Sequence, residues 1–374
     1  GLGQHLFPMF PELHEQLHTM VSDPGAMLGE HLLYPRSMHR LSSAELKAHE
    51  AQMLSESIAM LEIGSSIGAA YTHLLRQSFK VQPEIVFGYS QGETAMFQIL
   101  GVWRDGDACS AALRGSDLYR TRLAGRKDAV REFWGASTAS ISDDDLWANY
   151  ILMTSAESVV PHLADEPHVY LAIITAPREV MIAGDPAGCQ RVIRKVGCRS
   201  LRTPFGQVIH SPPIRSEYAE FVRINTFPVE PPPGITFYSA ATYAPLAITS
   251  EAVAHSAAQV FCNQLDFPRL VERVYADGAR VFIELGAART CSRWIEAILG
   301  NRPHTALAIN KKGTDDQISI VRLLAQLASH GVALDLAPLY RYTPAPPAPT
   351  GALVRRVLTG GIPLATQLAN CSAA

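Results

Sequence analysis

Short apolar runs alternate with stretches of helical spacing between residues 147 and 205. Apolar runs of strand length predict strands, and apolar residues that recur every three or four positions predict helices. Turns follow the strands, and Gly197 is a typical helix stop. The order β-α-β-β-α-β is typical of a ferredoxin-like unit. Its predicted segments are strand 147–155, helix 156–166, strand 169–177, strand 179–186, helix 187–197 and strand 200–205.

A second pattern, EIVFGYSQGETAM at residues 84–96, places a serine between two glycines. Residues 85–87 predict a short buried strand, and residues 93–100 predict a helix. The turn between them must be tight, and glycine permits the close backbone approach that such a turn needs. The strain of the turn leaves the Ser90 hydroxyl exposed at the helix N-terminus. Amides at such a terminus can hold an oxyanion. Ser90 is therefore a candidate nucleophile; the alternative is a chance Gly-x-Ser-x-Gly in an ordinary turn.

A nucleophilic serine needs a base, and the base needs a third group to orient it. His210, in TPFGQVIHSPPI, is the candidate base, because it follows the last predicted strand and two prolines hold it in a loop. Taken alone, a histidine in a loop is more often a surface residue without a catalytic role. Asp266, just ahead of a predicted helix, is the candidate orienting residue, through its carboxylate or its backbone carbonyl. The order Ser90, His210, Asp266 differs from the Ser-acid-His order of ordinary α/β-hydrolases, which disfavours a lipase or an esterase.

Composition excludes several classes of protein. The 374 residues are 47% hydrophobic and 18% charged, which suits a globular chain with a sizeable core. A net charge of −3 gives no electrostatic case for binding nucleic acid or an anionic membrane. The six cysteines are scattered, which indicates neither a zinc ribbon nor a disulfide framework. No apolar run approaches the ~20 residues of a membrane span, and a signal peptide is not evident, so a cytoplasmic location is expected.

Two features mark the ends of the chain. Residues 339–353 are rich in Pro and Ala and predict an extended linker rather than packed structure. At the other end there is no initiator Met, which indicates that the chain is a piece of something longer.

Taken together, these blocks resemble the acyltransferase family of fatty-acid and polyketide synthases, typified by malonyl-CoA:acyl-carrier-protein transacylases. GYSQGETAM resembles its nucleophile block, VIHSP its histidine block, and LDFPRLVERVYADGARVFIELGAARTCSRWI its C-terminal block. GLG at residues 1–3 resembles the remnant of its first-strand loop. The closest likeness is to the PfaB type, the acyltransferase of polyunsaturated fatty-acid (omega-3) synthases.

The resemblance implies an α/β fold, in which an α/β-hydrolase-like large subdomain carries an inserted ferredoxin-like small subdomain. The large subdomain would comprise residues 1–125 and 206–339, and the small one residues 126–205. Residues 340–374 would be a Pro-rich linker and tail. The active site would lie in the cleft between the two subdomains.

The resemblance also implies a role for each block residue. Ser90 would take the acyl group from a thioester, and His210 would accept the serine proton and later activate the pantetheine thiol of an acyl carrier protein. The amides of Gln91 and Leu2 would form the oxyanion hole. The substrates would be acyl-CoA and acyl carrier protein, and the partners other domains of a multidomain synthase. No metal or organic cofactor would be needed.

One position departs from the family pattern. Malonyl-transferring members carry an Arg, about one helix after the serine, that pairs with the free malonyl carboxylate. In this sequence the position falls on Gly115, and a displacement of one residue turns a helical side chain by about 100°, so the adjacent Arg114 is not equivalent. Ile209, before the histidine, is also apolar. The pocket is expected to favour uncharged acyl chains; the alternative is a malonyl loader in which Arg114 or Arg120 reaches the pocket.

Other functions are compatible with parts of the sequence. The motif HEQLH fits a zinc hydrolase with His14 and His18 as ligands and Glu15 as general base, but it also fits an amphipathic surface helix. A thioesterase would use the same acyl-serine and let water discharge it. A non-catalytic domain that only docks a carrier protein would be expected to have a broken pair at Ser90 and His210.

Overall fold

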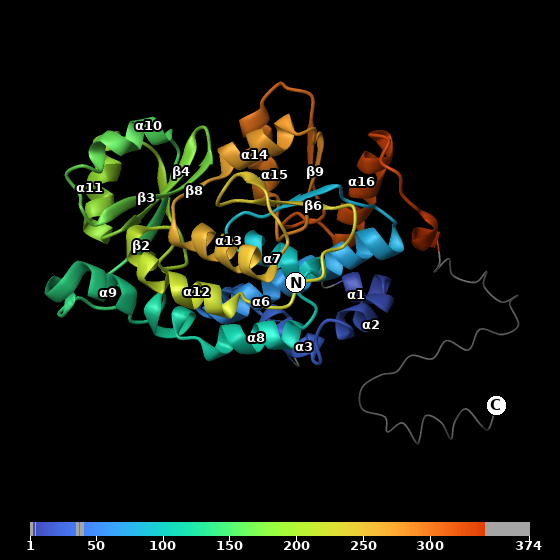
Figure 1. Cartoon of the computed structure of the whole chain (residues 1–374), viewed down its shortest axis with the longest axis horizontal. Helices are drawn as coiled ribbons and strands as arrows, with labels where there is room; N and C mark the ends of the chain where they lie inside the picture. The colour runs from blue at the N-terminus through green and yellow to red at the C-terminus, as the bar shows by residue number, and fades with distance from the viewer. Residues whose placement is uncertain (1–2, 4, 35–36, 38–40, 341–374) are drawn as a thin grey trace, which may run out of the picture. The chain divides into compact units, whose positions relative to one another are not determined.

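The computed structural model describes residues 3, 5–34, 37 and 41–340. Within these residues the strands form three sheets, in the orders β1-β6-β7, β10-β9 and β5-β2-β4-β3-β8 (Figure 1). Helices connect most of the strands, so the fold is of the mixed α/β class.

The first sheet carries the turn that holds Ser90. The apolar residues ahead of the serine form β1 (Ile85–Phe87), with the bounds that the sequence predicts. β1 pairs in parallel with β6 (Thr236–Ser239), which continues into the antiparallel β7 (Ala244–Pro245). In the second sheet, β9 (Val281–Glu284) and β10 (Thr305–Ala308) are also parallel. A parallel pair needs a crossover connection, and α15 (Thr290–Leu299) provides it.

The third sheet follows the predicted order of elements. β2 (Ala148–Leu152), β3 (Val169–Ala176), β4 (Glu179–Gly184) and β5 (Ser200–Arg202) pair antiparallel, with α10 (Ala156–Val159) and α11 (Pro186–Val196) as connections. The helix predicted for 156–166 is shorter than expected, because Pro161 lacks an N–H and the chain continues as the 3₁₀ turn η4 (Val160–His162). β8 (Leu265–Asp266), which the sequence pattern did not predict, adds to this sheet parallel to β3.

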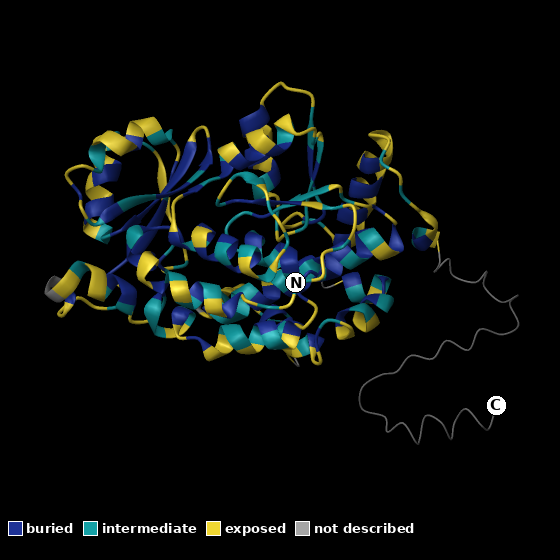
Figure 2. Cartoon of the chain, in the orientation of Figure 1, coloured by how far each residue is buried: buried dark blue, intermediate teal, exposed yellow. Residues whose placement is uncertain are grey.

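Both faces of β4, in the middle of the third sheet, are buried, whereas the edge strand β5 is exposed (Figure 2). Successive side chains of a strand point to opposite faces. On β4, Val180 and Ile182 therefore pack in one core with α11, whereas Met181 and Ala183 belong to the main core. As a result, this sheet contributes residues to the wall of the cavity beside Ser90.

The helix after Ser90 lies between two longer helices. α7 (Gly92–Ile99) contacts α6 (Ser57–His73) on one side and α13 (Ser250–Cys262) on the other. The turns η1 (Leu74–Ser78) and η2 (Leu118–Arg122) are π-helical. The other helices are α1 (Leu6–Met9), α2 (Glu12–His18), α3 (Pro24–Met27), α4 (Glu30–Leu33), α5 (Ser43–Ser55), α8 (Gly106–Gly115), α9 (Asp128–Trp134), α12 (Tyr218–Ile224), α14 (Phe267–Ala276) and α16 (Asp316–Ser329), with 3₁₀ turns η3 (Gly135–Thr138), η5 (Pro212–Glu217) and η6 (Ala337–Tyr340).

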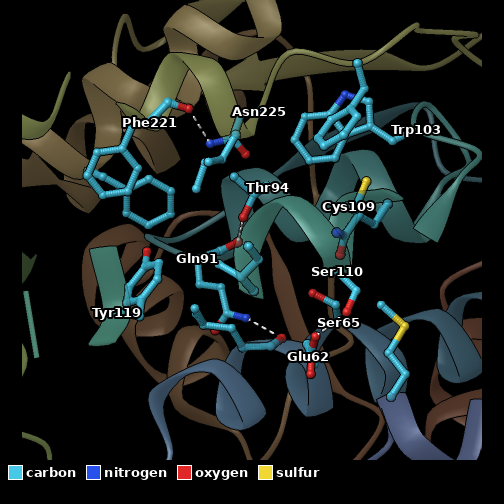
Figure 3. Close-up of a pocket in the computed structure, with 17 residues that line it drawn as sticks. Glu62, Ser65, Gln91, Thr94, Trp103, Cys109, Ser110, Tyr119, Phe221 and Asn225 are labelled. Carbon is cyan, nitrogen blue, oxygen red and sulfur yellow. Dashed lines mark hydrogen bonds between the residues drawn. The ribbon is translucent and has the colours of Figure 1, made fainter. Parts of the chain in front are cut away.

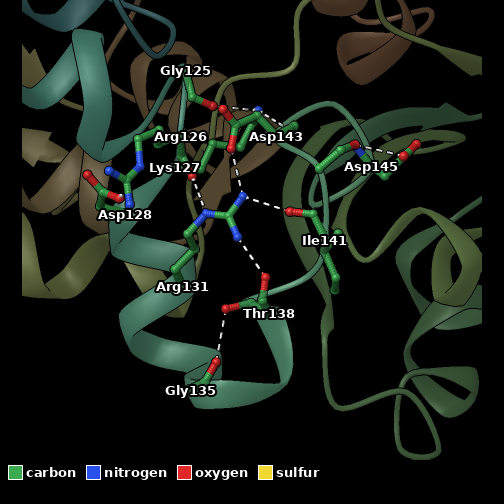
Figure 4. A network of polar contacts seen from close by, with 11 residues as sticks. Gly125, Arg126, Lys127, Asp128, Arg131, Gly135, Thr138, Ile141, Asp143 and Asp145 are labelled. Atoms are coloured by element: carbon green, nitrogen blue, oxygen red, sulfur yellow. Dashed lines mark hydrogen bonds and ion pairs between the residues drawn. The ribbon is translucent and has the colours of Figure 1, made fainter.

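A polar network orders the segment between η2 and β2 (Figure 4). The guanidinium of Arg131, on α9, donates to three backbone carbonyls of this segment and to Asp143 Oδ1 at 2.7 Å. The Lys127 ammonium donates to two further carbonyls, at 2.6 and 3.1 Å. These bonds satisfy backbone oxygens in a stretch with little regular structure and fix the entry of the chain into β2.

The described residues up to Asp335 form one compact unit. Most of the predicted linker and tail, residues 340–374, lies outside the described residues. The boundaries predicted at 125/126 and 205/206 stay predictions. None of the helices in the described ranges is both long and apolar enough to cross a membrane, and the cytoplasmic location stays a prediction as well.

Candidate active site

Ser90 lies on a tight turn between β1 and α7. Its φ of 54° is in the left-handed region, which side chains rarely adopt, so the turn stores strain. Gly88 and Gly92 approach each other so closely that a Cβ on Gly88 would lie 2.0 Å from the carbonyl carbon of Gly92. Only glycine fits at position 88. The turn therefore holds the Ser90 hydroxyl at the N-terminus of α7, as the sequence predicts.

The imidazole of His210 lies directly against this hydroxyl. Ser90 Oγ and His210 Nε2 are 2.8 Å apart. The other ring nitrogen, Nδ1, lies 2.8 Å from the Val260 carbonyl oxygen and 3.2 Å from that of Asn263. Because carbonyl oxygens only accept, Nδ1 carries the proton, and Nε2 can accept the proton of Ser90. His210 also has a left-handed φ, of 39°, so both members of the pair have strained backbones.

Burial decides the charge of the base. His210 is 2% exposed, and burial lowers the pKa of its imidazole to about 4, although the hydrogen bonds to the two carbonyls act in the opposite direction. The imidazole is therefore neutral at pH 7, which is the form that a general base requires.

Asp266 does not contact the imidazole. Its carboxylate caps α14 by accepting the N–H of Arg269 at 3.0 Å, and its own N–H donates to the Tyr243 hydroxyl at 3.1 Å. The orienting contacts come instead from Val260 and Asn263, at the C-terminal end of α13. Carbonyls at a helix end lack partners within the helix, which leaves them free to accept from the ring. The expectation that Asp266 orients His210 is corrected accordingly.

Asp266→Ala is expected to leave acyl transfer nearly unchanged and to lower the free energy of unfolding by about 1 kcal/mol, because the helix cap is lost. Parallel denaturant unfolding and acylation assays measure the two effects. If the acylation rate falls roughly 100-fold in a variant that is still folded, Asp266 supports His210 after all.

A buried carboxylate ties the nucleophile helix to the helix that orients the base. Glu93, on α7, is fully buried and accepts from Ser256 Oγ at 2.6 Å and from the Ala240 N–H at 3.1 Å. Ser256 lies on α13, one turn ahead of Val260. Burial raises the pKa of Glu93 to about 7, although the hydrogen bonds act against this shift. Through this contact, the positions of Ser90 and His210 depend on each other.

Of the two residues expected to form the oxyanion hole, the structure describes Gln91 but not Leu2. The N–H of Gln91 precedes α7 and has no acceptor in the part of the chain that the structure describes, so it is available to a developing negative charge. The side chain of Gln91 is engaged elsewhere, because its Nε2 donates to the Leu61 carbonyl at 2.6 Å. Leu2, the second expected donor, lies outside the described residues.

A largely apolar cavity of about 240 Å³ lies beside the Ser90–His210 pair, and both residues line it. No Lys, Arg, Asp or Glu is among the described residues that line this pocket. Ile209 lines it, as the sequence predicts. Ile173 and Met181, from β3 and β4, line it as well, so its walls come from both predicted subdomains.

The arginines considered for malonyl binding are engaged away from this pocket. Arg114 pairs with the buried carboxylate of Glu62, with Nε 2.8 Å from Oε1 and Nη2 2.5 Å from Oε2. Arg120 donates to the carbonyl of Arg114. Gly115 ends α8, and a Cβ there would meet no atom within 4 Å. Tyr119, on the π-helical turn η2, lines the pocket instead. The described walls thus offer no cation to a substrate carboxylate.

The HEQLH motif lies on α2, whose residues Leu13 and Leu17 are buried. The ring of His14 packs 4.7 Å from that of Phe7. Across residues 3, 5–34, 37 and 41–340, no three His, Cys, Asp or Glu side chains are close enough together to hold a metal ion. The amphipathic helix accounts for this motif, and a zinc hydrolase is not favoured.

Comparison with known proteins supports the predicted resemblance. No known family profile matches the chain. The chain is 27% identical over 356 residues to a polyunsaturated fatty acid synthase subunit of Thraustochytrium sp., and the match covers 91% of this chain and 17% of that protein. The chain therefore spans less than a fifth of that relative.

Solved structures show the same fold. The acyltransferase domain from the second module of the salinomycin polyketide synthase has a TM-score of 0.67 and 20% identity, covering 91% of this chain and 72% of that one. A malonyl-transacylase, solved in complex with its type II polyketide synthase acyl carrier protein, has a TM-score of 0.65 and 16% identity, covering 87% and 94%. The chain is thus similar in sequence to a polyunsaturated fatty acid synthase subunit, and it has the fold of the acyltransferase domains of polyketide synthases.

Proposed function

We propose that this chain is a Ser-His acyltransferase that moves an uncharged acyl group from a CoA or carrier-protein thioester to the pantetheine thiol of an acyl carrier protein. The observation that carries the proposal is the 2.8 Å contact between Ser90 Oγ and His210 Nε2 at the wall of an apolar pocket. The similarity to a fatty acid synthase subunit supports the same reaction class. The architecture that accompanies it is an α/β-hydrolase-like subdomain with a ferredoxin-like insert.

The reaction proceeds in two matched halves. His210 Nε2 takes the proton as Ser90 Oγ attacks the thioester carbonyl carbon, and the Gln91 N–H stabilises the negative charge on the carbonyl oxygen. The C–S bond then breaks, the proton passes from His210 to the departing thiolate, and the acyl group remains as an ester on Ser90. In the second half, His210 takes the proton of the incoming thiol, whose sulfur attacks the ester, and returns it to Ser90 Oγ.

The lining of the pocket supports an uncharged acyl group. A malonyl carboxylate placed there would lose its hydration without gaining a cationic partner, because Arg114 is paired with Glu62. Burial of such a charge costs several kcal/mol or more. An alkyl chain has no such cost and gains about 0.8 kcal/mol for each buried methylene.

The proposed substrates and partners follow from the same chemistry. Acyl carrier protein is proposed as the acceptor, and one structural neighbour was solved in complex with such a protein. Other domains of a multidomain synthase are proposed as neighbours, because the match covers only 17% of the synthase subunit that this chain resembles. The serine, the base and backbone amides complete the reaction, so we propose that no metal or organic cofactor takes part.

Transfer is tested by supplying octanoyl-CoA and a phosphopantetheinylated acyl carrier protein. We expect octanoyl-carrier protein to form faster than free octanoate, with both measured by mass spectrometry. Carrier protein without phosphopantetheine is the control, and it should stay unmodified. Free acid as the main product at saturating carrier protein would contradict transfer and indicate a thioesterase.

A further inference from the structure

A second, smaller chamber adjoins the pocket beside Ser90, and Figure 3 shows the residues that line this chamber. Its volume is about 60 Å³, against about 240 Å³ for the pocket. The two spaces are not independent, because the same residues line both of them. These shared residues are Leu61, Gln91, Tyr119, Phe221 and Phe261.

The shared residues form a wall between the two cavities. One part of this wall is held by a hydrogen bond, and the other part consists of aromatic rings. On the fixed part, the hydrogen bond from Gln91 Nε2 to the Leu61 carbonyl holds the amide in place. On the aromatic part, the Phe221 ring stacks on Phe261 with centroids 5.0 Å apart and meets the Tyr119 ring edge-on at 6.5 Å. Two of the three rings come from helices α12 and the end of α13, whereas Tyr119 comes from the short π-helical turn η2.

Tyr119 is the aromatic residue of the wall that a short turn carries, whereas Phe221 and Phe261 belong to helices. Its hydroxyl makes no hydrogen bond to any residue in the described ranges, in contrast to the Gln91 amide. Packing alone holds the ring, so a side-chain rotation would break no polar contact. A ring in this position can close the pocket for a short acyl group and move aside for a longer one.

The chamber on the far side has a mixed lining, in which the uncharged polar side chains are Ser65, Gln91, Thr94, Gln98, Ser110 and Asn225. Trp103, Cys109 and Phe227 supply apolar surface there. The carboxylate of Glu62, which also lines the chamber, is paired with Arg114 and accepts from Ser110 Oγ at 2.5 Å. No unpaired charge therefore meets a hydrocarbon tail among the described lining residues.

We propose that the pocket and the chamber are two compartments of one acyl tunnel, and that Tyr119 is the residue that sets the acyl chain length. Dry apolar cavities of about 150 Å³ accept a benzene molecule, so the 240 Å³ pocket holds a medium-length chain by itself. The additional 60 Å³ accommodates a few more carbons once the wall opens. This inference rests on the proposed acyltransferase function and specifies its substrate class.

The experiment measures kcat/KM for acylation of Ser90 across straight-chain acyl-CoAs from butyryl to palmitoyl, in wild type and Tyr119→Ala. Removing the ring joins the two compartments. We expect the preferred chain to become at least two methylenes longer, with about a tenfold gain for the longer chain relative to the shorter one. Tyr275→Ala is the matched control, because this tyrosine lines neither compartment, and its chain-length profile should equal that of wild type.

A second substitution separates wall removal from general loosening. In the Tyr119→Ala background, Ser65→Leu places a larger side chain in the chamber but not in the pocket, because Ser65 lines only the chamber. The gain for longer chains should then be lost. If Tyr119→Ala does not fold, Tyr119→Leu replaces it in the same assays.

The possible results distinguish this inference from the function on which it rests. If wild type is acylated at Ser90 but Tyr119→Ala keeps the wild-type profile, the two-compartment tunnel is wrong and the acyltransferase stands. A gain that survives Ser65→Leu also contradicts the tunnel. If wild type accepts no acyl group from any donor, both the function and the inference fail.

Discussion

Ser90→Ala is expected to take up no acyl group from any acyl-CoA. The alanine variant retains the pocket and the base but lacks the oxygen that forms the ester, and removal of a catalytic nucleophile can cost a factor of about 10⁶ in turnover. Intact mass spectrometry after incubation with octanoyl-CoA measures the adduct directly. The wild-type protein should gain one octanoyl group, and peptide mapping should place it on Ser90.

The control for this substitution is Ser329→Ala, which removes an exposed hydroxyl on α16 and should acylate like wild type. The left-handed φ of Ser90 makes alanine strained there as serine is, so no large change in stability is expected from the substitution. If the folded Ser90→Ala protein still gains the mass of one octanoyl group, the nucleophile lies elsewhere in the chain.

His210→Ala is expected to slow acylation by about 10²–10⁴-fold, because Ser90 loses the group that accepts its proton. The ester should still form slowly, at the same serine, since the Gln91 amide and the pocket are unchanged. Stopped-flow or quenched-flow acylation with octanoyl-CoA measures the ratio of rates. A reduction below roughly threefold, with the fold intact, would exclude His210 as the base.

The dependence of kcat/KM on pH is an independent test of the protonation state of His210. Burial lowers the pKa of the His210 imidazole to about 4, so the imidazole is neutral and able to accept a proton at every pH above that value. For the wild-type free enzyme, kcat/KM should thus stay level as the pH falls from 8 to about 5, and decrease only as the pH approaches about 4. A midpoint near the ordinary histidine value of 6.5 would mean that the imidazole is hydrated in solution.

The two residues of the Ser90–His210 pair were predictable because their signals are local. The turn around Ser90 needs glycine at position 88, where a Cβ would clash with the backbone of Gly92, so it appears in the sequence as a short motif. His210 was predictable because it follows the last predicted strand of the ferredoxin-like unit and stands ahead of two prolines. The α/β class and the order of elements from β2 to β5 followed from the same kind of local pattern.

Other features depend on contacts between distant parts of the chain. Val260 and Asn263 orient His210 through backbone carbonyls, which every residue possesses, so no side chain marks them in the sequence. Asp266 was chosen because it is acidic and precedes a helix, and that is also the description of a helix cap. The pairing of Arg114 with Glu62, 52 positions away, is equally invisible until α6 and α8 are placed side by side.

A competition between acyl donors separates an uncharged acyl substrate from malonyl in a single measurement. Malonyl-, acetyl-, octanoyl- and palmitoyl-CoA are supplied together at equal concentration, and intact mass is read on Ser90 within the first turnover. An uncharged acyl ester on Ser90, in excess over malonyl, is the result expected from an apolar pocket without a cation among its described lining residues. If malonyl is the only acyl group found on Ser90, the proposed function is contradicted. Arg114 or Arg120 would then have to leave the partners seen in the structure.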